Sequence, residues 1–428
     1  MIVDEYELSP IQQGMLFHHL KDEHSGIDIE QLVIEYKEPL DVVSLERAWQ
    51  ATIDKHPMLR SSFRWEGLPS PVQHVHDAAG ICIEQHQCAD AAAFSAFIMA
   101  DRRRGFDLAR PPLMRLSWLR SDGSSSRLVW TLHHILMDGR AFVIVLDEVE
   151  RYYRDLRRGV VPNTKPGAPY KPYVGWIRSL DLSGAAEFWR EKLSGLSAPT
   201  PLPLEPDHLP KDVSSHGEIE HQLSKEVTSA LRAMAKQHDI TLNTVVMGVW
   251  AIVLARFSGE SDVLFGATKT TRRASIANGD SVVGLFLNTL PVRIDVSDTM
   301  QVVEMLKRLR NEWVSLRPYE HAPLVQIKQA SAFPGAAQLF DSLVVFENQR
   351  FDTALASCGP EWCERELRWF EQTNYGLTLL AYGDPAMTLK LEFDVRRFSR
   401  ATAQRILAHV VQAFASVAQN PYDTLANA

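Results

Sequence analysis

The sequence predicts a mixed protein of the α/β or α+β class. Helical spacing of apolar residues and strand-like alternation both occur in each half of the 428 residues. Proline-rich stretches at 160–172 and 199–210 interrupt both patterns and are the best candidates for a boundary. No repeat of fixed period and no low-complexity tract is present.

In the first half, Ser9 followed by Pro10 indicates the start of a short helix. Leu45, Trp49 and Ile53 have the spacing of one helical face. The loop 121–124 has hairpin chemistry and separates two strands. We expect strands over 30–37, 113–119 and 127–132, and helices over 41–55, 91–103 and from 140 onward.

The second half resumes with a strand, and Ser224 is positioned to cap the helix that follows it. The helix over 241–257 is largely apolar, which predicts that it is buried. We expect strands over 218–223, 263–267, 284–293, 341–346, 377–382 and 387–393, and helices over 185–193, 241–257, 302–316 and 401–418.

Composition excludes several classes of protein. A formal net charge of -8 argues against a nucleic-acid binder, which usually carries a basic field. The sequence contains no run of about 20 apolar residues, so it predicts no membrane span. The N-terminus lacks the pattern of a signal peptide, and the four cysteines lack the spacing of a zinc site. We therefore expect a cytoplasmic protein with reduced thiols.

The most informative segment is 133–139, which contains two adjacent histidines, an aspartate and a glycine. It follows a predicted strand and precedes a predicted helix, and loops of this kind often carry function. Histidine titrates near neutral pH and suits general-base catalysis on an amine, hydroxyl or thiol. Asp138 would pair with an arginine and hold the geometry of the loop.

Two other kinds of site fit this segment less well. Adjacent histidines on an extended segment point apart, so His133 and His134 cannot easily bind one metal ion together. A serine hydrolase would need a Gly-x-Ser-x-Gly turn, which the sequence lacks. We therefore expect no metal and no serine nucleophile.

Around these histidines the chain resembles the condensation domains of nonribosomal peptide synthetases, which belong to the chloramphenicol-acetyltransferase-like superfamily. The resemblance covers nearly the whole chain and consists of seven segments in the family's order. They are 9–18, 56–63, 133–139, 170–176, 284–293, 319–324 and 340–343.

The resemblance implies two acetyltransferase-like lobes, 1–178 and 179–428, in a V-shaped pseudo-dimer with a tunnel between them. The donor is then an acyl or peptidyl thioester on the 4'-phosphopantetheine arm of a carrier protein, and no intrinsic cofactor is needed. The acceptor is an amine or hydroxyl, carrier-bound or a small molecule, and the product an amide or an ester. We expect a monomer, either a free-standing enzyme or an excised domain.

The resemblance also assigns roles to residues. His134 is the catalytic base or positions the nucleophile, beside His133, and the backbone of Gly139 lies near the reacting centre. Asp138 is structural and pairs with an arginine, for which Arg60 and Arg272 are both candidates. Asn288 and Thr289 are expected to line the tunnel and bind substrate.

Departures from the family pattern place the usual aminoacyl acceptor in doubt. Arg140 and Ala141 follow Gly139 where amide-forming members commonly have Trp and Ser. We hypothesise that Arg140 binds a carboxylate of the acceptor. The alternatives are an acyltransferase that uses acyl-CoA, a non-catalytic recruitment module and an epimerase; recruitment modules usually lack part of the histidine motif, which is intact here.

Overall fold

The computed structural model describes residues 1–428 except 23–24, 121–125, 163, 203–215, 273–275, 334–337 and 428. Within these residues the chain divides into two compact units, and neither unit is one continuous segment. Unit 1 comprises Met1–Leu180, Thr270–Leu287 and Phe351–Thr373. Unit 2 comprises Asp181–Lys269, Asn288–Arg350 and Asn374–Ala428.

The first crossing between the units falls within two residues of the predicted boundary after residue 178. Two later segments, 270–287 and 351–373, return to unit 1, so the continuous ranges 1–178 and 179–428 do not describe the units. The second of these segments carries a strand that hydrogen-bonds to the sheet of unit 1. Backbone pairing over this distance along the chain leaves no local pattern in the sequence.

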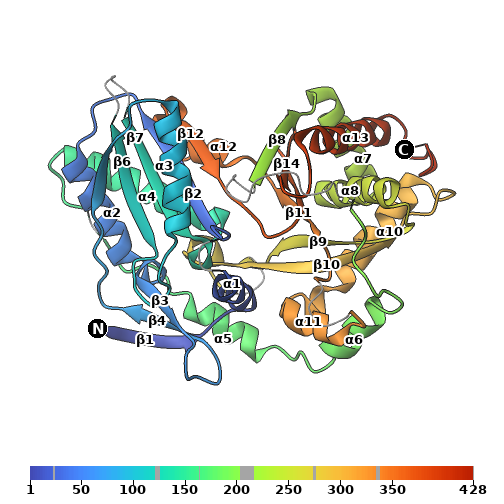
Figure 1. Cartoon of the computed structure of the whole chain (residues 1–428), viewed down its shortest axis with the longest axis horizontal. Coiled ribbons are helices and arrows are strands. Elements are labelled where there is room, and N and C mark those ends of the chain that lie inside the picture. Colours follow the sequence, from blue (N-terminus) through green and yellow to red (C-terminus); the bar gives the residue numbers. More distant parts are fainter. Residues whose placement is uncertain are drawn as a thin grey trace. The chain divides into compact units, whose positions relative to one another are not determined.

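Unit 1 contains a five-stranded sheet in the order β12-β2-β7-β6-β5, in which β12 pairs with β2 although it lies more than 300 residues later (Figure 1). Its neighbouring strands are antiparallel except for the parallel pair β5 and β6. A second sheet has the order β1-β4-β3. The strands are β1 (Ile2–Glu7), β2 (Ile29–Tyr36), β3 (Ser61–Arg64), β4 (Val72–His76), β5 (Ile83–Gln87), β6 (Met114–Arg120), β7 (Ser126–His133) and β12 (Glu366–Phe370).

Helices cover both faces of the five-stranded sheet because alternate strand residues are apolar on both faces. Leu32 and Trp130 pack in one cluster with α2 and α4, whereas Val33 and Val129 pack in another cluster with α3. The helices of unit 1 are α1 (Pro10–Lys21), α2 (Val42–Lys55), α3 (Ala91–Arg104), α4 (Gly139–Arg157), α5 (Lys171–Ser179) and α12 (Phe351–Ala356).

Unit 2 contains one six-stranded sheet in the order β10-β9-β11-β13-β14-β8. The strands β9, β11 and β13 run parallel, while β13, β14 and β8 alternate in direction. The strands are β8 (His216–Gln222), β9 (Asp262–Thr270), β10 (Leu287–Asp295), β11 (Ser342–Glu347), β13 (Leu377–Tyr382) and β14 (Thr388–Asp394).

Two groups of helices pack against this sheet. The larger core cluster includes Phe265 of β9 and Leu391 of β14 and involves α7, α8, α10 and α13; the smaller cluster includes Leu264 and Leu290 and involves α6 and α11. The helices are α6 (Ala185–Lys192), α7 (Lys225–Gln237), α8 (Leu242–Ser258), α10 (Val302–Ser315), α11 (Leu324–Ala330) and α13 (Arg400–Gln419).

Local signals in the sequence account for the helices well. Ser9 caps α1 in a reciprocal capping box with Gln12, and Asp41 and Ser224 cap α2 and α7. The apolar helix α8 is buried from Thr244 to Leu254, as predicted. All the predicted strands are present to within a few residues, whereas β1, β3, β4, β5 and β12 were not anticipated. The antiparallel pairing of β6 and β7 agrees with the predicted hairpin, but its loop 121–124 lies outside the described residues.

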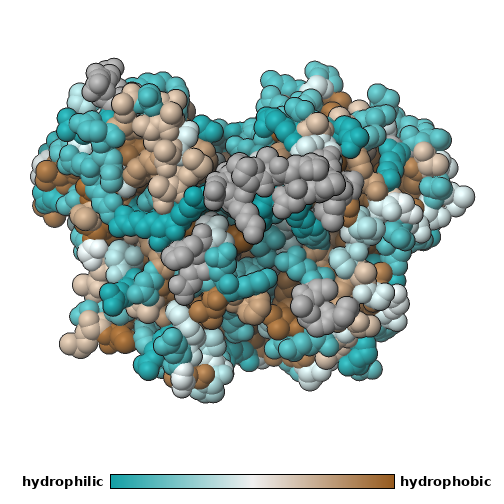
Figure 2. Space-filling view, in the orientation of Figure 1, coloured by the Kyte–Doolittle hydropathy of each residue, from teal (hydrophilic) through white to brown (hydrophobic). Residues whose placement is uncertain are grey.

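The surface is mixed in character and the individual helices are short or polar. On the face shown in Figure 2, hydrophilic residues are interspersed with scattered hydrophobic ones. Within the described ranges, no single helix is long and apolar enough to cross a membrane. The helices α7 and α8 reach the required length only as a pair, and they bend by 108° relative to each other.

Candidate active site

The histidine motif lies where the central strand of unit 1 passes into a helix, as predicted. His133 is the last residue of β7, and His134 begins a 3-10 turn that ends at Leu136. Asp138 caps the N-terminus of α4, and Gly139 is the first residue of that helix. The strand ends at His133 and the turn begins at His134, so the two side chains have different surroundings.

His133 is a buried, neutral residue that supports the loop. Its side chain is about 1% exposed, and Nδ1 accepts a hydrogen bond from the backbone N–H of Ile135 at 3.2 Å. Its ring also contacts His19 edge-on, with centroids 5.7 Å apart. Burial lowers the pKa of His133 from 6.5 to about 3. His133 is therefore uncharged at neutral pH and is poorly placed to exchange protons with a substrate.

His134 is only partly buried and has the hydrogen bonding of a general base. Its Nδ1 atom lies 2.7 Å from the backbone carbonyl oxygen of Met137. Because a carbonyl oxygen only accepts hydrogen bonds, this contact places a proton on Nδ1, so the neutral form of the ring has its lone pair on Nε2. The backbone N–H of His134 donates to the carbonyl of Asp28 at 2.7 Å. Backbone contacts thus fix both the tautomer and the position of this imidazole.

The Asp138 carboxylate is buried and is used entirely for structure. Oδ1 accepts the N–H of Ala141 at 3.0 Å, which caps α4, and pairs with Nη2 of Arg272 at 2.5 Å. Oδ2 accepts the N–H of Phe286 at 3.0 Å. Asp138 therefore joins the loop after β7 to the segment 270–287, as a structural residue should.

The structure distinguishes between the two arginines considered as partners of Asp138. Arg272 forms the ion pair, and its guanidinium also donates to the carbonyls of Gly279 at 2.7 Å and Val282 at 2.6 Å. Arg60 instead donates to backbone carbonyls, among them that of Asp77 at 3.0 Å. The guanidinium of Arg272 also lies over the ring of Phe286, 4.2 Å from its centroid, which adds a cation–π contact to these hydrogen bonds.

The fourth family-like segment holds the chain that carries Arg272. The hydroxyl of Tyr170 donates to the carbonyl of Leu285 at 2.5 Å, and Tyr173 shares a hydrogen bond of 2.8 Å with Thr271. Gly284 lies against the ring of Tyr170, where an added Cβ would come within 2.3 Å of it. The glycine is required because the backbone approaches the ring too closely for any side chain.

The first family-like segment supports the loop from the other side. The side chain of Gln12 is buried, and its amide donates to the carbonyl of Ile135 at 3.2 Å and to Gln73 at 3.0 Å. Gln12 thus links α1 to the turn that carries His134. Sequence motif, helix cap and site geometry coincide at this residue.

The remaining predicted residues have more varied surroundings. Arg140 is exposed on α4, and its Nε lies 3.4 Å from the carbonyl of Asp280. In unit 2, the amide of Asn288 donates to the carbonyls of Glu320 at 2.8 Å and Ala322 at 3.1 Å. Thr289 is buried on β10. The Asn288 amide is therefore engaged by backbone rather than presented to a ligand.

Sequence reasoning missed two aromatic residues near the imidazole. Phe142 lies with its ring centroid 5.8 Å from that of His134, and Trp369 of β12 lies 4.7 Å from Phe142. Phe142 follows Asp138 by one helical turn, so its position on the buried face of α4 could have indicated it. No local signal connects Trp369 to a histidine motif more than 200 residues earlier.

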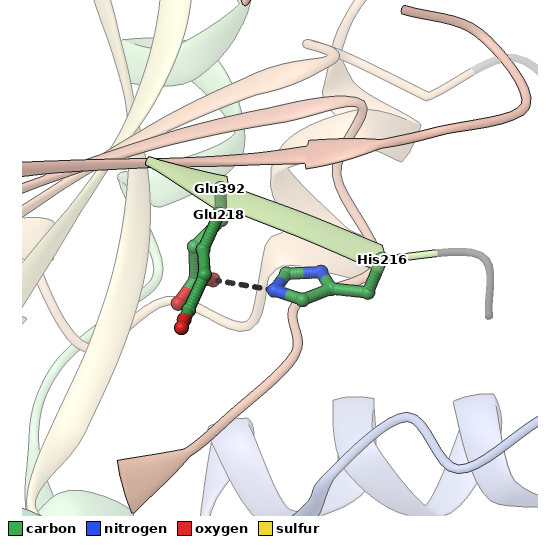
Figure 3. Close-up of side chains that lie close together, drawn as sticks. All are labelled: His216, Glu218 and Glu392. Atoms are coloured by element: carbon green, nitrogen blue, oxygen red, sulfur yellow. Dashed lines mark ion pairs between the residues drawn. The ribbon is translucent and has the colours of Figure 1, made fainter. Parts of the chain in front are cut away.

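One group of side chains within the described residues has the composition of a metal site. His216 and Glu218 of β8 lie beside Glu392 of β14, with their ligand atoms within 4.8 Å of one another (Figure 3). The ammonium group of Lys390 lies 2.8 Å from Glu392 and supplies the positive charge that a buried carboxylate requires. Lys390 and Glu392 thus form an ion pair in the sheet of unit 2, and the ring of His216 lies 4.0 Å from the same carboxylate.

Comparison with known proteins identifies the family. The family model described as "Condensation domain" matches residues 2–428. The chain belongs to this family. A linear gramicidin synthase from Brevibacillus parabrevis is 36% identical over 100% of the chain, which spans only 8% of that relative's length.

Solved structures share the fold of this condensation domain. The condensation domain from monacolin K polyketide synthase MokA matches with a TM-score of 0.79 at 18% identity, over 99% of each chain. The X-domain in complex with OxyB from teicoplanin biosynthesis matches with a TM-score of 0.83 at 20% identity, over 100% of this chain and 96% of the other. The predicted family, mixed α/β fold and acyltransferase class are confirmed. The family's reaction is peptide-bond formation in nonribosomal peptide biosynthesis.

The ion pair of this condensation domain predicts a large effect on stability. Arg272→Ala would leave the Asp138 carboxylate buried without its cation, which should lower the free energy of unfolding by about 3–5 kcal/mol. Arg60→Ala removes hydrogen bonds to carbonyls only and should cost about 1–2 kcal/mol. Urea denaturation of the two variants tests this difference, and equal losses would show that the buried ion pair has no special weight.

The buried state of His133 predicts how stability depends on pH. The unfolded chain binds a proton at His133 near pH 6.5, whereas the folded chain does so only near pH 3. The free energy of unfolding should therefore fall as the pH is lowered through this interval, by up to ~1.4 kcal/mol per pH unit from this residue.

His133→Asn retains a hydrogen-bond acceptor but does not titrate, so its stability should vary less steeply between pH ~6 and ~4.5. The exposed His221→Asn variant is the matched control and should keep the wild-type slope. Chemical denaturation at several pH values measures all three slopes. Identical slopes for the wild type and His133→Asn would contradict the assigned neutral state.

Proposed function

We propose that this condensation domain transfers an acyl or peptidyl group from a carrier-protein phosphopantetheine thioester to an amine or hydroxyl acceptor. The product is an amide or an ester in nonribosomal peptide or hybrid polyketide biosynthesis. The observation that carries this proposal is the Nε2 lone pair of His134, which results from the contact between Nδ1 and the carbonyl of Met137. Nδ1 of His133 and both oxygens of Asp138 bind within the protein.

The proposed step needs one base and a held pair of reactants. The acceptor nitrogen or oxygen attacks the thioester carbonyl while Nε2 of His134 takes its proton, so the new bond forms as the proton leaves. Collapse of the adduct breaks the carbon–sulfur bond, and the proton passes from His134 to the departing thiolate. Alignment of the two bound reactants lowers the free-energy barrier further, by about 7–11 kcal/mol in favourable cases.

His133 contributes to this reaction without touching the substrate. Its buried neutral ring accepts the N–H of Ile135 and so shapes the turn on which His134 lies. Asp138 and Gly139 likewise fix the end of the turn and the start of α4. We propose that His134 alone exchanges the proton. Asn288 and Thr289 are proposed to shape the substrate passage from unit 2, Asn288 through the backbone carbonyls that its amide holds.

The proposed reaction requires a carrier protein as partner. The donor arrives on a carrier protein, whose phosphopantetheine arm takes the place of an intrinsic cofactor. The two units are proposed to form a V-shaped pseudo-dimer with a tunnel through which donor and acceptor meet. The protein is proposed to act as a monomer in the cytoplasm.

The catalytic assignment predicts a loss of activity in His134→Ala. Leucine loaded on a phosphopantetheine carrier protein is supplied with amine and alcohol acceptors, and mass spectrometry measures the product. Removal of the base should lower kcat roughly 10²–10⁴-fold. The exposed His221→Ala variant is the control and should retain activity.

Two further donors distinguish the alternatives. Leucyl N-acetylcysteamine tests whether the thioester alone is sufficient, and octanoyl-CoA tests an acyl-CoA-dependent reaction. Full activity of His134→Ala with any donor would show that this imidazole is not the base. Product from octanoyl-CoA but not from the loaded carrier would favour the CoA-dependent acyltransferase.

If Arg140 binds the carboxylate of the acceptor, the enzyme should prefer acceptors that carry a carboxylate. Its hydrogen bond to Asp280 is long, at 3.4 Å, and a carboxylate can replace it. Arg140→Ala should raise the KM for alanine by up to about fivefold, as expected for an exposed ion pair, and leave the KM for alaninamide unchanged. Equal KM values for alanine in the variant and the wild type would remove Arg140 from the acceptor site.

A further inference from the structure

Two aromatic side chains, Trp369 and Phe142, form a series of ring contacts that ends at the imidazole of His134. The ring of Phe142 is tilted by 35° to that of His134, with centroids 5.8 Å apart. The indole of Trp369 lies on Phe142 with centroids 4.7 Å apart and a tilt of 41°. The contact from Trp369 to the catalytic ring therefore passes through one intervening side chain.

Trp369 is anchored on the same sheet that carries the histidine motif. It lies on β12, opposite Leu32 of β2. Its indole N–H donates to the carboxylate of Glu30 at 2.7 Å, and the Glu30 residue is about 3% exposed. A buried carboxylate that accepts an N–H forms a short and strong hydrogen bond. The indole is therefore held at a defined place rather than resting loosely on the sheet.

Phe142 is confined between two tryptophans and cannot adjust freely. Trp130 of β7 meets it edge-on at 5.9 Å, and Trp369 meets it at 4.7 Å. The Phe142 side chain is about 4% exposed. Close-packed aromatic rings of this kind transmit a displacement to their neighbours instead of absorbing it.

We propose that Trp369 is a positioning residue for His134, acting through Phe142. The inference rests on the proposed role of His134 as the base. The hydrogen bond to Met137 restrains one edge of the imidazole, and the ring of Phe142 lies beside the imidazole at a tilt of 35°. Trp369 determines where Phe142 can lie, and the strand that brings it to unit 1 thereby takes part in preparing the reaction.

This arrangement predicts a defect in the chemical step rather than in substrate binding. A displaced base costs rate because proton transfer needs close alignment, and a shift of 1 Å can cost about 10²-fold. Trp369→Leu should lower kcat roughly 10- to 100-fold and change KM little. Trp369→Phe retains an aromatic ring against Phe142 but loses the hydrogen bond to Glu30, so its kcat should lie between those of Trp369→Leu and the wild type.

Phe370→Leu is the matched control. Phe370 neighbours Trp369 on β12 but packs with the cluster of Val33 and Phe94 on the other face of the sheet. The two leucine variants remove an aromatic ring from the same strand, so both should lower the thermal midpoint. Circular dichroism measures the folded fraction of each variant. When kcat is expressed per folded enzyme, only Trp369→Leu should show a lower value.

A second readout is independent of turnover. Diethylpyrocarbonate modifies histidine rings, and peptide mass spectrometry gives the rate at His134 itself. Release of the ring should make His134 react faster in Trp369→Leu, with an intermediate rate in Trp369→Phe and the wild-type rate in Phe370→Leu. Unchanged rates and kcat in Trp369→Leu, or equal effects in Phe370→Leu, would overturn the proposal.

The two readouts separate this proposal from the proposed function. Activity retained by His134→Ala refutes the assignment of the base, whatever Trp369 does. Faster modification of His134 in Trp369→Leu supports the positioning role even when none of the donors gives product. Faster modification with an unchanged kcat in an active enzyme would show that Trp369 restrains the ring without affecting the reaction, and would overturn the proposed role.

Discussion

The buried ion pair between Asp138 and Arg272 joins the parts of unit 1 that carry the histidine motif. Asp138 caps α4 and fixes the end of the turn, while Arg272 collects the carbonyls of a segment that arrives from far along the chain. Two buried charges are costly unless each is fully satisfied, and here every contact described for them is a hydrogen bond or an aromatic face. The carbonyl of Gly284 accepts a further hydrogen bond from Arg272, and two tyrosines hydrogen-bond to the same segment.

The adjacent histidines show how environment divides the work between identical side chains. His133 belongs to the strand and is surrounded by protein, so its ring stays neutral and structural. His134 belongs to the turn, where backbone carbonyls determine its orientation. A change of one residue in the chain separates the packing role of His133 from the catalytic role proposed for His134, because the strand ends between them.

The sequence predicted those features that local chemistry controls. Helix caps such as Ser9 and Asp41, and buried strands such as those around Leu32 and Trp130, can be recognised from their immediate neighbours. The choice between Arg60 and Arg272 could not be made, because it depends on a contact between residues 134 positions apart. β12 was missed for the same reason: its five residues gain their stability from pairing with β2, which the local pattern does not encode.

The excursion of the chain into unit 1 at 351–373 also has a consequence for biosynthesis. During synthesis β2 is made first, but the strand that pairs with its open edge emerges only after more than 300 further residues. Until then an unpaired strand edge is available to other nascent chains, a recognised route to aggregation. A gene cut after residue 180 would leave that edge permanently exposed, so this protein cannot be dissected into halves simply by dividing its coding sequence.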